Sequence, residues 1–235
     1  HRVADDWTYG LPELCEEQRA RIGSADRVSN PGCYSSTFIL LLRPLIDAGL
    51  IPTDVPISIH ALSGYSGGGK SLIERWENHD NELADLQYEA PYALGWVHKH
   101  IPEMQRYTGL TVQPQFLPAV GPFHSGMRVQ VPLHESIFYN RPDGEEIWTL
   151  LNQRYAGEPF IQVAPFAGFE AVSENDLDPT GFNGSNQLQI HVFPNPAGHI
   201  LLVGLLDNLG KGASGVAVQC LNLMLGLPEE AGLPV

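Results

Sequence analysis

The chain has 235 residues, a hydrophobic content of 43% and a formal net charge of −14 at pH 7. This hydrophobic content is typical of a folded globular protein and excludes a disordered one, while the acidic excess argues against a nucleic-acid ligand, whose phosphates attract clustered Lys and Arg. No apolar run approaches the roughly 18–20 residues of a membrane-spanning helix, and the widely spaced Cys15, Cys33 and Cys220 favour a reducing, cytoplasmic location over a disulfide framework.

The first part of the chain predicts a long helix with short elements on either side of it. Residues 1–27 predict a turn and a short helix in "YGLPELCEEQRARIGSA". The next stretch, "RVSNPGCYSSTFILLLRPLIDAGL", predicts a strand, a tight Asn-Pro-Gly turn and a helix that ends near Gly49, because apolar residues recur at helical spacing. "PISIHAL" then predicts a strand, which is followed by a glycine-rich loop and a helix to about Leu86.

The rest of the chain is rich in strands. "YALGWVHKHIPEMQRYTGL" predicts a strand end that runs into a helix with Pro102 in its first turn. Further strands are predicted for "LTVQPQFLPAV", "GMRVQVPLHES", "FIQVAP", "QLQIHVFP" and "HILLVGLLDN", and a terminal helix for "KGASGVAVQCLNLMLGL". Strand–helix units at both ends and strands in the middle indicate an α+β fold with an incomplete α/β portion.

The cysteine at the start of the long helix is the first candidate for chemistry. Cys33 follows a turn in which Asn30 and Gly32 allow a substrate to approach the backbone closely. A helix N-terminus lowers a thiol pKa from about 8.5 towards the range of about 3.5–7.5 found for reactive thiols. Cys33 is therefore a candidate nucleophile, and the alternative is a small buried hydrophobe in a strand–turn–helix link.

The segment "HKHIPE" offers a candidate acid–base group. His98 and His100 alternate as on a strand, and His100 and Glu103 are spaced to meet across one helical turn. A carboxylate partner would orient the imidazole and fix its tautomer, as in general acid–base catalysis. A metal site would need a third ligand, for which no spacing is present, and histidines on a solvated strand are the simpler alternative.

The stretch "GYSGGGKS", residues 64–71, matches the phosphate-loop pattern G-x-x-x-x-G-K-[ST] at every position. It lies between a predicted strand and a predicted helix, as such a loop requires, so an ATP-binding regulator is one interpretation. "VGLLD", which ends at Asp207, fits the acidic strand of an ATPase, although this short pattern is common by chance. A phosphate loop usually follows the first strand of its domain, and this one does not.

A second glycine-rich segment, "DNLGKGASG", precedes the terminal helix. Asn208 and Lys211 are polar groups beside a helix N-terminus, which could hold a cofactor amide or a phosphate. Small residues that allow close helix packing are the alternative.

Taken together, "NPGCY", "SGYSGGGK", "HKHIPE" and "DNLGKGASGVAVQCLNLMLGL" resemble the N-acetyl-gamma-glutamyl-phosphate reductases, in this order and along essentially the whole chain. "YGLPEL" before the cysteine motif is similar to the shorter, second type of this family. The resemblance implies that residues 64–71 lie beside a nicotinamide cofactor instead of ATP. Ser35 replaces a usual proline, and Val216 and Cys220 replace a usual glutamine and asparagine, none of which is a reacting group.

The resemblance also implies a domain organisation. The fold would be an α+β catalytic domain of the glyceraldehyde-3-phosphate-dehydrogenase-like C-terminal type, with the remaining part of a Rossmann domain. The front of that Rossmann domain, roughly 70–90 residues, has no counterpart here, so we expect a fragment that binds NADP weakly or undetectably by itself. The implied boundaries are 1–33 for the tail of the NADP-binding domain, 34–205 for the catalytic and dimerisation domain, and 206–235 for a helix that returns to the cofactor domain.

The implied reaction is the NADPH-dependent reduction of an acyl phosphate to an aldehyde. Cys33 would form a thioester, and His100, oriented by Glu103, would act as acid and base, with His98 as the second choice for that role. The implied cofactor-binding residues are Ser63, Gly64, Gly67, Asn208, Lys211 and Gly212. The implied candidates for the substrate's phosphate and carboxylate are Arg2, Lys99 and Arg128.

The resemblance implies no metal, no membrane partner and a homo-oligomer, either a dimer or a tetramer. An aspartate-semialdehyde-dehydrogenase-like reductase of another acyl phosphate remains an alternative, since it shares the cysteine–histidine plan. "HKHIPE" and "DNLGKGASG" favour the glutamyl-phosphate branch.

Overall fold

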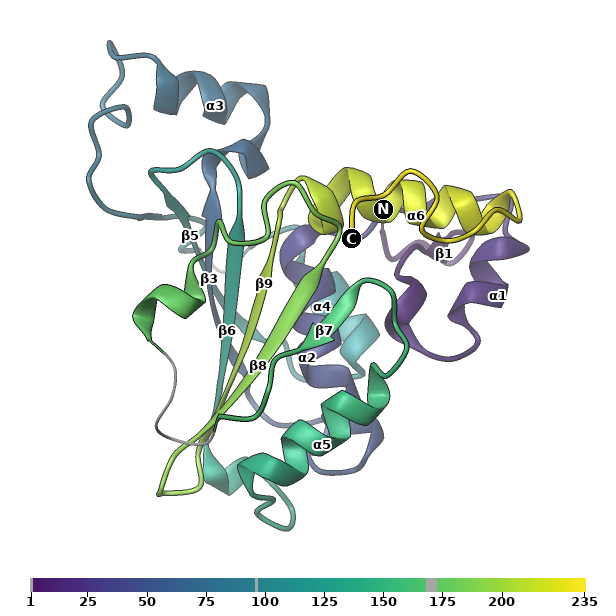
Figure 1. The fold of residues 1–235 in the computed structure, drawn as a ribbon. Helices are drawn as coiled ribbons and strands as arrows, with labels where there is room; N and C mark the ends of the chain where they lie inside the picture. Colours follow the sequence, from purple (N-terminus) through teal and green to yellow (C-terminus); the bar gives the residue numbers. More distant parts are fainter. Residues whose placement is uncertain (1, 96, 168–172) are drawn as a thin grey trace.

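A mixed β-sheet forms the centre of the molecule (Figure 1). The computed structural model describes residues 2–95, 97–167 and 173–235. Within them, the sheet has seven strands in the order β4-β5-β3-β6-β9-β8-β7. Their bounds are Ala90–Pro91 (β4), Gln115–Gly121 (β5), Ser58–Gly64 (β3), Met127–Leu133 (β6), Ile200–Leu206 (β9), Leu188–Pro194 (β8) and Ile161–Val163 (β7). The pairs β3–β5 and β7–β8 are parallel and the other pairs are antiparallel.

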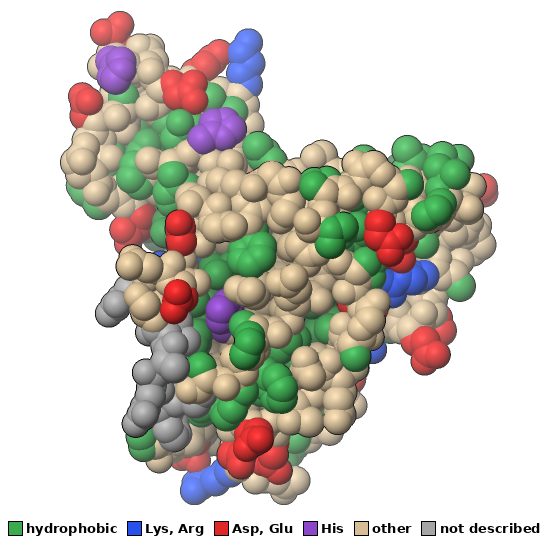
Figure 2. All heavy atoms as spheres, in the orientation of Figure 1, with side chains coloured by type: hydrophobic (Ala, Val, Ile, Leu, Met, Phe, Trp, Pro, Cys, Tyr) green, Lys and Arg blue, Asp and Glu red, His purple; other side chains and the backbone are tan. Residues whose placement is uncertain are grey.

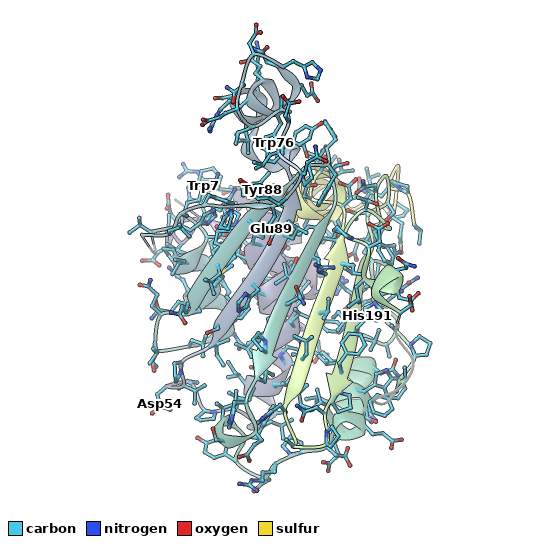
Figure 3. The ribbon with its side chains drawn as sticks, turned by 90° about the vertical axis from the view of Figure 1, so that its left-hand side faces the viewer. Trp7, Asp54, Trp76, Tyr88, Glu89 and His191 are labelled. Carbon is cyan, nitrogen blue, oxygen red and sulfur yellow. The ribbon has the colours of Figure 1, made fainter. Side chains whose placement is uncertain are left out.

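Among the described residues, three α-helices cover one face of this sheet, and the short 3-10 helix Glu174–Leu177 lies over the other face, where the carbonyl of Leu177 accepts from Arg128 (Figures 1 and 3). The covering helices are α2 (Cys33–Asp47), α4 (Ile101–Thr108) and α5 (Gly144–Arg154). Along β6, buried Met127, Val129 and Val131 alternate with the less buried Arg128 and Gln130. Because successive strand residues point to opposite faces, this alternation separates the helix-covered face from the open face.

Helix α2 is the buried centre of the helical layer. Phe38, Leu41, Leu42 and Leu45 are each 0% exposed, as expected for a helix enclosed between the sheet and other helices. Pro44 lies inside the helix and has no N–H for the carbonyl of Leu40. The hydroxyl of Tyr155 donates to that carbonyl at 2.5 Å instead, so α5 satisfies the acceptor that the proline leaves open.

The two ends of the chain lie together beside the sheet (Figure 1). Strands β1 (Thr8–Tyr9) and β2 (Val28–Ser29) pair in parallel, and α1 (Gln18–Gly23) packs on the terminal helix α6 (Gly215–Met224). Ile22, Val216 and Cys220 form a small core between these helices. A π-helical turn, Gly210–Ser214, leads from β9 into α6.

A separate lobe projects from the end of β3. The glycine-rich loop continues into a 3-10 helix, Tyr65–Gly68, and then into α3 (Lys70–Glu77). Figure 1 shows α3 above the sheet edge, and Figure 3 shows Trp76 at the base of this lobe. The ring of Trp76 stacks on Tyr65 with centroids 5.7 Å apart, which fastens α3 to the loop before it.

The predicted α+β fold and most predicted elements are confirmed. One predicted helix end was wrong, because α3 ends at Glu77 and not near Leu86, and helix α5 was not predicted. The sequence does carry a signal for α5, because Asp143 and Glu146 form a capping box at its start. No helix in the described ranges is long and apolar enough to cross a membrane.

Candidate functional site

A cavity of about 640 Å³ opens between the N-terminus of α2, the glycine-rich loop and the α3 lobe. Figure 2 shows the molecule hollowed between this lobe and the body of the protein. The lining combines polar groups with an apolar wall, as expected for a small-molecule site. The lining residues are Cys33, Tyr34, Ser63, Gly64, Gly67, Gly68, Leu72, Arg75, Trp76, Leu83, Ala90, Pro91, Tyr92, Val97, His98, Lys99, His100 and Val120.

Cys33 occupies the first position of α2, as the sequence predicted, and borders the cavity. The expected lowering of its pKa was wrong in direction. Burial raises the pKa of the Cys33 thiol to about 11, and the backbone N–H of Tyr34 and the charges of Arg2 and Lys99 oppose this rise only in part. Desolvation of a thiolate therefore outweighs the helix N-terminus, and the thiol is protonated at neutral pH.

The turn before Cys33 is held by segments from both ends of the chain. The side chain of Asn30 donates to the carbonyl of Ala213 at 3.0 Å, which joins the turn to the entry of α6. A Cβ built on Gly32 would overlap Nε2 of His100, so only glycine leaves room for the imidazole there. This close approach brings His100 next to the turn that carries the thiol.

His98 and His100 both lie at the cavity and are neutral at physiological pH. Burial lowers the pKa of His100 to about 2, and His98, Arg2 and Lys99 lower it further. Burial likewise lowers the pKa of His98 to about 4. The backbone N–H of His100 donates to Nδ1 of His98 at 3.1 Å, so the neutral His98 carries its proton on Nε2, 3.4 Å from the hydroxyl of Tyr92.

Glu103 does not orient His100, contrary to the prediction from their spacing. Its carboxylate oxygens instead accept hydrogen bonds from Gly32, Ser35, Tyr9 and Arg2. Nδ1 of His100 is buried without a hydrogen-bond partner in the described part of the chain. The i, i+3 spacing placed both residues near the site, but the carboxylate of Glu103 contacts the turn before Cys33 (the cysteine turn, residues 30–33) instead of the imidazole of His100.

The glycine-rich loop forms one wall of the cavity. Ser63, Gly64 and Gly67 line it, as predicted. Asn208 does not line it: this side chain is 2% exposed, donates to Oγ of Ser66 at 3.0 Å and accepts from the N–H of Gly126 at 2.7 Å. Asn208 therefore supports the loop from behind instead of facing a cofactor.

Lys70 lies outside the cavity. Its side chain is 89% exposed and pairs with Glu74 at 3.7 Å on the surface of α3. A phosphate loop needs its lysine to reach the β- and γ-phosphates. The arrangement gives no support to the ATP interpretation of residues 64–71.

The predicted cofactor residues Lys211 and Gly212 lie behind Cys33. Lys211 is 3% exposed, and its ammonium donates to Glu13 at 2.6 Å and to Gln219 at 2.7 Å. Gly212 is buried against the side chain of Cys33. Neither is among the residues that line the cavity, and both fix how α6 packs on the site; their role as cofactor ligands stays a prediction.

The three predicted substrate cations are placed differently. Lys99 is exposed and lines the cavity, whereas Arg2 pairs with Glu103 at 2.9 Å beside Gly32. Arg128 lies on the open face of the sheet, where it donates to the carbonyl of Leu177 at 3.0 Å and borders a different hollow of about 320 Å³. The prediction of Arg128 as a ligand in the Cys33 cavity was wrong, because its position in β6 directs it to the opposite face.

Sequence reasoning missed the contribution of α3. Leu72, Arg75 and Trp76 line the cavity from this helix. Their i, i+3, i+4 spacing places them on one helical face. The sequence therefore indicated a shared face, but it did not show that this face borders the cavity. Tyr34 and Tyr92 were also missed; their hydroxyls are 3.3 Å apart at the cavity wall.

The residues present fit a nicotinamide ring better than a metal ion. The described residues contain no group of three or more His, Cys, Asp or Glu side chains that could hold a metal. Gly64, Gly67 and Gly68 instead line the cavity together with the apolar Leu72 and Trp76. Such a surface accepts a flat ring that must approach a reacting carbon closely.

Comparison with known proteins agrees with this site. Residues 33–208 match the family described as semialdehyde dehydrogenase, dimerisation domain. The fold is also that of aspartate semialdehyde dehydrogenase II from Vibrio cholerae, with a TM-score of 0.69 and 19% identity over 96% of this chain and 70% of that one. The enzyme of the same name from Francisella tularensis gives a TM-score of 0.70 at 14% identity, over 95% and 72% of the two chains. Fold and site thus define a semialdehyde-dehydrogenase-type oxidoreductase, a class that uses a nicotinamide cofactor.

Curated relatives narrow the class. N-acetyl-gamma-glutamyl-phosphate reductase 2 of a Nostoc species is 49% identical over 99% of this chain and 74% of its own length. The Pseudomonas putida reductase 2 is 45% identical over 99% and 73%, and a Burkholderia lata reductase is 44% identical over 98% and 72%. The chain belongs to the N-acetyl-gamma-glutamyl-phosphate reductase family.

Proposed function

We propose that this protein carries out the NADPH-dependent reduction of N-acetylglutamyl 5-phosphate to N-acetylglutamate 5-semialdehyde, a step of arginine biosynthesis. The observation that carries the proposal is Cys33 at the wall of a cavity that it shares with neutral His98 and His100. Relatives that are 43–49% identical bear the name of this reductase, which supports the choice of substrate.

In this proposal Cys33 is the nucleophile. Its sulfur attacks the acyl carbon, the C–O bond to phosphate breaks, and phosphate leaves with the electron pair, so that a thioester remains on Cys33. Because the resting thiol is protonated, deprotonation accompanies C–S bond formation. Covalent capture replaces a charged leaving group with a neutral acyl group before reduction.

His100 is the proposed acid and base. Burial leaves His100 neutral, the form that can accept a proton, but its low pKa makes it a weak base. The proposed reaction therefore requires the anionic acyl phosphate to raise the pKa of His100 on binding, so that the imidazole takes the thiol proton and passes it to the departing phosphate. A reduced nicotinamide, if bound beside the glycine-rich loop, would supply a hydride to the thioester carbon. As the C–S bond then breaks, a proton drawn from solvent through His100 restores the thiol, and His98 holds the backbone of His100 in place.

NADP is the proposed form of the nicotinamide cofactor, with Ser63, Gly64 and Gly67 at its reacting end. Residues 1–33 are proposed as the tail of the NADP-binding domain, 34–205 as the catalytic and dimerisation domain, and 206–235 as the segment that returns to the cofactor domain. A cytoplasmic location completes the proposal, supported by free Cys15, Cys33 and Cys220, which suit a reducing compartment.

Cations at the cavity suit a substrate with a phosphate and a carboxylate. In a chain with a net charge of −14, the exposed Lys99 and Arg75 lie at the cavity from different elements. Lys99 and Arg2 act electrostatically on Cys33, so they are proposed to attract the phosphate. Arg75 on α3 is proposed to meet the carboxylate at the far end of the substrate.

The open face of the sheet is the proposed dimer interface. The matching family is described as a dimerisation domain, and among the described residues this face carries no α-helix (Figure 3). His60, Leu117 and Arg128 border its hollow. Sedimentation of wild type and Leu117→Glu tests the proposal, because a buried carboxylate on this face would shift a dimer to monomer.

Mass spectrometry of the enzyme mixed with acyl phosphate and no cofactor tests the reaction directly. We expect an acyl adduct on Cys33 in the wild type and none in Cys33→Ser. A panel that includes aspartyl phosphate separates the two branches of the class. Product formation without any adduct on Cys33, or preference for the aspartyl substrate, would overturn the proposal.

A further inference from the structure

Glu103, on helix α4, accepts hydrogen bonds from the turn that precedes Cys33 and from residues near it. Glu103 is buried, with 1% of its surface exposed. One carboxylate oxygen, Oε2, accepts from the N–H of Gly32 at 2.9 Å, from Oγ of Ser35 at 2.9 Å and from the hydroxyl of Tyr9 at 3.0 Å. These donors come from the N-terminal cap and first turn of α2 and from β1.

The second oxygen, Oε1, pairs with Arg2 at 2.9 Å. Arg2 also lies over the turn, since a Cβ built on Gly32 would be 2.6 Å from its guanidinium. A carboxylate and a guanidinium are therefore packed together beside Gly32 at the start of α2. Ordinary helix capping would not need a partly buried ion pair at this point.

The carboxylate of Glu103 at this place should raise the pKa of the Cys33 thiol. The N-terminus of a helix favours negative charge, and the carboxylate already satisfies that preference. A thiolate at Cys33 would be a second negative charge in the same turn, which is unfavourable in a buried setting. Burial is the main cause of the raised pKa of Cys33, and the further effect of the Glu103 carboxylate on this thiol is inferred from the geometry of the turn.

We propose that Glu103 is a positioning residue that fixes the turn carrying Cys33 and reserves the helix N-terminus, so that the thiol stays protonated until a base removes its proton. The proposal rests on Cys33 as the nucleophile. A neutral thiol does not repel an anionic acyl phosphate, and the negative charge on sulfur then develops only when the carbonyl carbon is within reach.

Other charged and titratable groups around Cys33 act differently from Glu103. Lys99 and Arg2 favour the thiolate, and His98 and His100 are uncharged. From the opposite side, Asp207 is engaged with the N–H groups of Gly184 and Leu209. The remaining titratable neighbours are Tyr34 and Tyr92, whose pKa values burial raises.

The test measures alkylation of Cys33 by iodoacetamide at a fixed pH near 8, with each site quantified by mass spectrometry and Cys15 as the internal reference. The variants are Glu103→Gln, Arg2→Met and the double variant, with Glu74→Gln on the surface of α3 as the matched control. Neither substrate nor cofactor is present, so a failure here is distinguishable from a failure of the proposed reaction.

We expect Glu103→Gln to alkylate about tenfold faster, which corresponds to a fall of about one unit in the thiol pKa. Arg2→Met should react more slowly than wild type, and the double variant should return to within about threefold of it. The tenfold gain of the double variant over Arg2→Met measures the same effect in a background without the charge of Arg2. An unchanged or slower rate on removal of the Glu103 charge overturns the proposal. A faster rate with an unchanged midpoint in the pH dependence of alkylation also overturns it, because local opening of the turn would expose the thiol without lowering its pKa.

Discussion

Gly212 and Cys33 are packed so closely that a Cβ built on Gly212 would lie 2.8 Å from the Cβ of Cys33. The contact joins the π-helical turn before α6 to the first residue of α2. Because Cys33 is the proposed nucleophile, the C-terminal segment helps to set its position. The glycine is required here for space, since neighbouring backbone and side chains enclose it.

We predict that Gly212→Ala lowers both stability and turnover. The added methyl would also meet Leu206 at 3.0 Å and the carbonyl of Asp207 at 3.2 Å, and overpacking of this kind costs about 1–3 kcal/mol. Urea denaturation measures the first effect, and kcat with saturating substrate measures the second. Gly181→Ala, whose new methyl would have only an ordinary contact at 3.4 Å, is the control. Equal behaviour of the two variants would contradict the packing argument.

Lys211→Met should destabilise the fold without weakening cofactor binding. Burial acts to raise the pKa of Glu13, but Lys211, together with hydrogen bonds from Gln219 and the backbone, more than offsets it and holds that pKa below its usual value. Removing one partner of a buried ion pair costs about 3–5 kcal/mol, and Lys211→Met/Glu13→Gln should recover part of this loss. Thermal melts measure stability, and KM for the cofactor measures binding. A large rise in that KM with little loss of stability would identify Lys211 as a cofactor ligand.

The buried histidines predict a loss of stability in mild acid. The pKa of His100 is lowered to about 2 by burial, so between the unfolded value of about 6.5 and that folded value only the unfolded chain takes up the proton. Stability therefore falls as pH drops below about 6.5, and His100 alone contributes about 2 kcal/mol of loss at pH 5. Unfolding free energies at pH 7 and pH 5 should differ less in His100→Asn than in wild type. The same difference in both proteins would show that His100 protonates in the folded state.

Removing a positive charge at the cavity should show whether that cation binds the substrate or the cofactor. We predict that Lys99→Met and Arg75→Met each raise KM for the acyl phosphate about tenfold, since each would lose an ion pair with the substrate, and leave KM for NADPH nearly unchanged. Arg128→Met serves as the control, because Arg128 lies on the open face of the sheet. If the KM for NADPH rises instead, the affected cation belongs to the cofactor.

Much of the site was predictable because its parts are local in sequence. The Asn-Pro-Gly turn and the apolar helix that follows determine that Cys33 begins α2. The alternation of strand residues and the glycine-rich loop after β3 are equally local. The order of these motifs along the chain was enough for the family resemblance, which the 43–49% identity of curated relatives confirms.

The tertiary structure alone decided which side chains become hydrogen-bond and ion-pair partners in the site. Glu103 is 71 residues from Gly32, and Lys211 is 198 residues from Glu13, so no local spacing could reveal these partners. The same holds for the charge state of Cys33: the sequence showed a helix N-terminus, but segments remote along the chain bury the thiol and raise its pKa. A sequence determines the chemical groups and their local geometry, whereas desolvation and pairing depend on everything that folding packs around them.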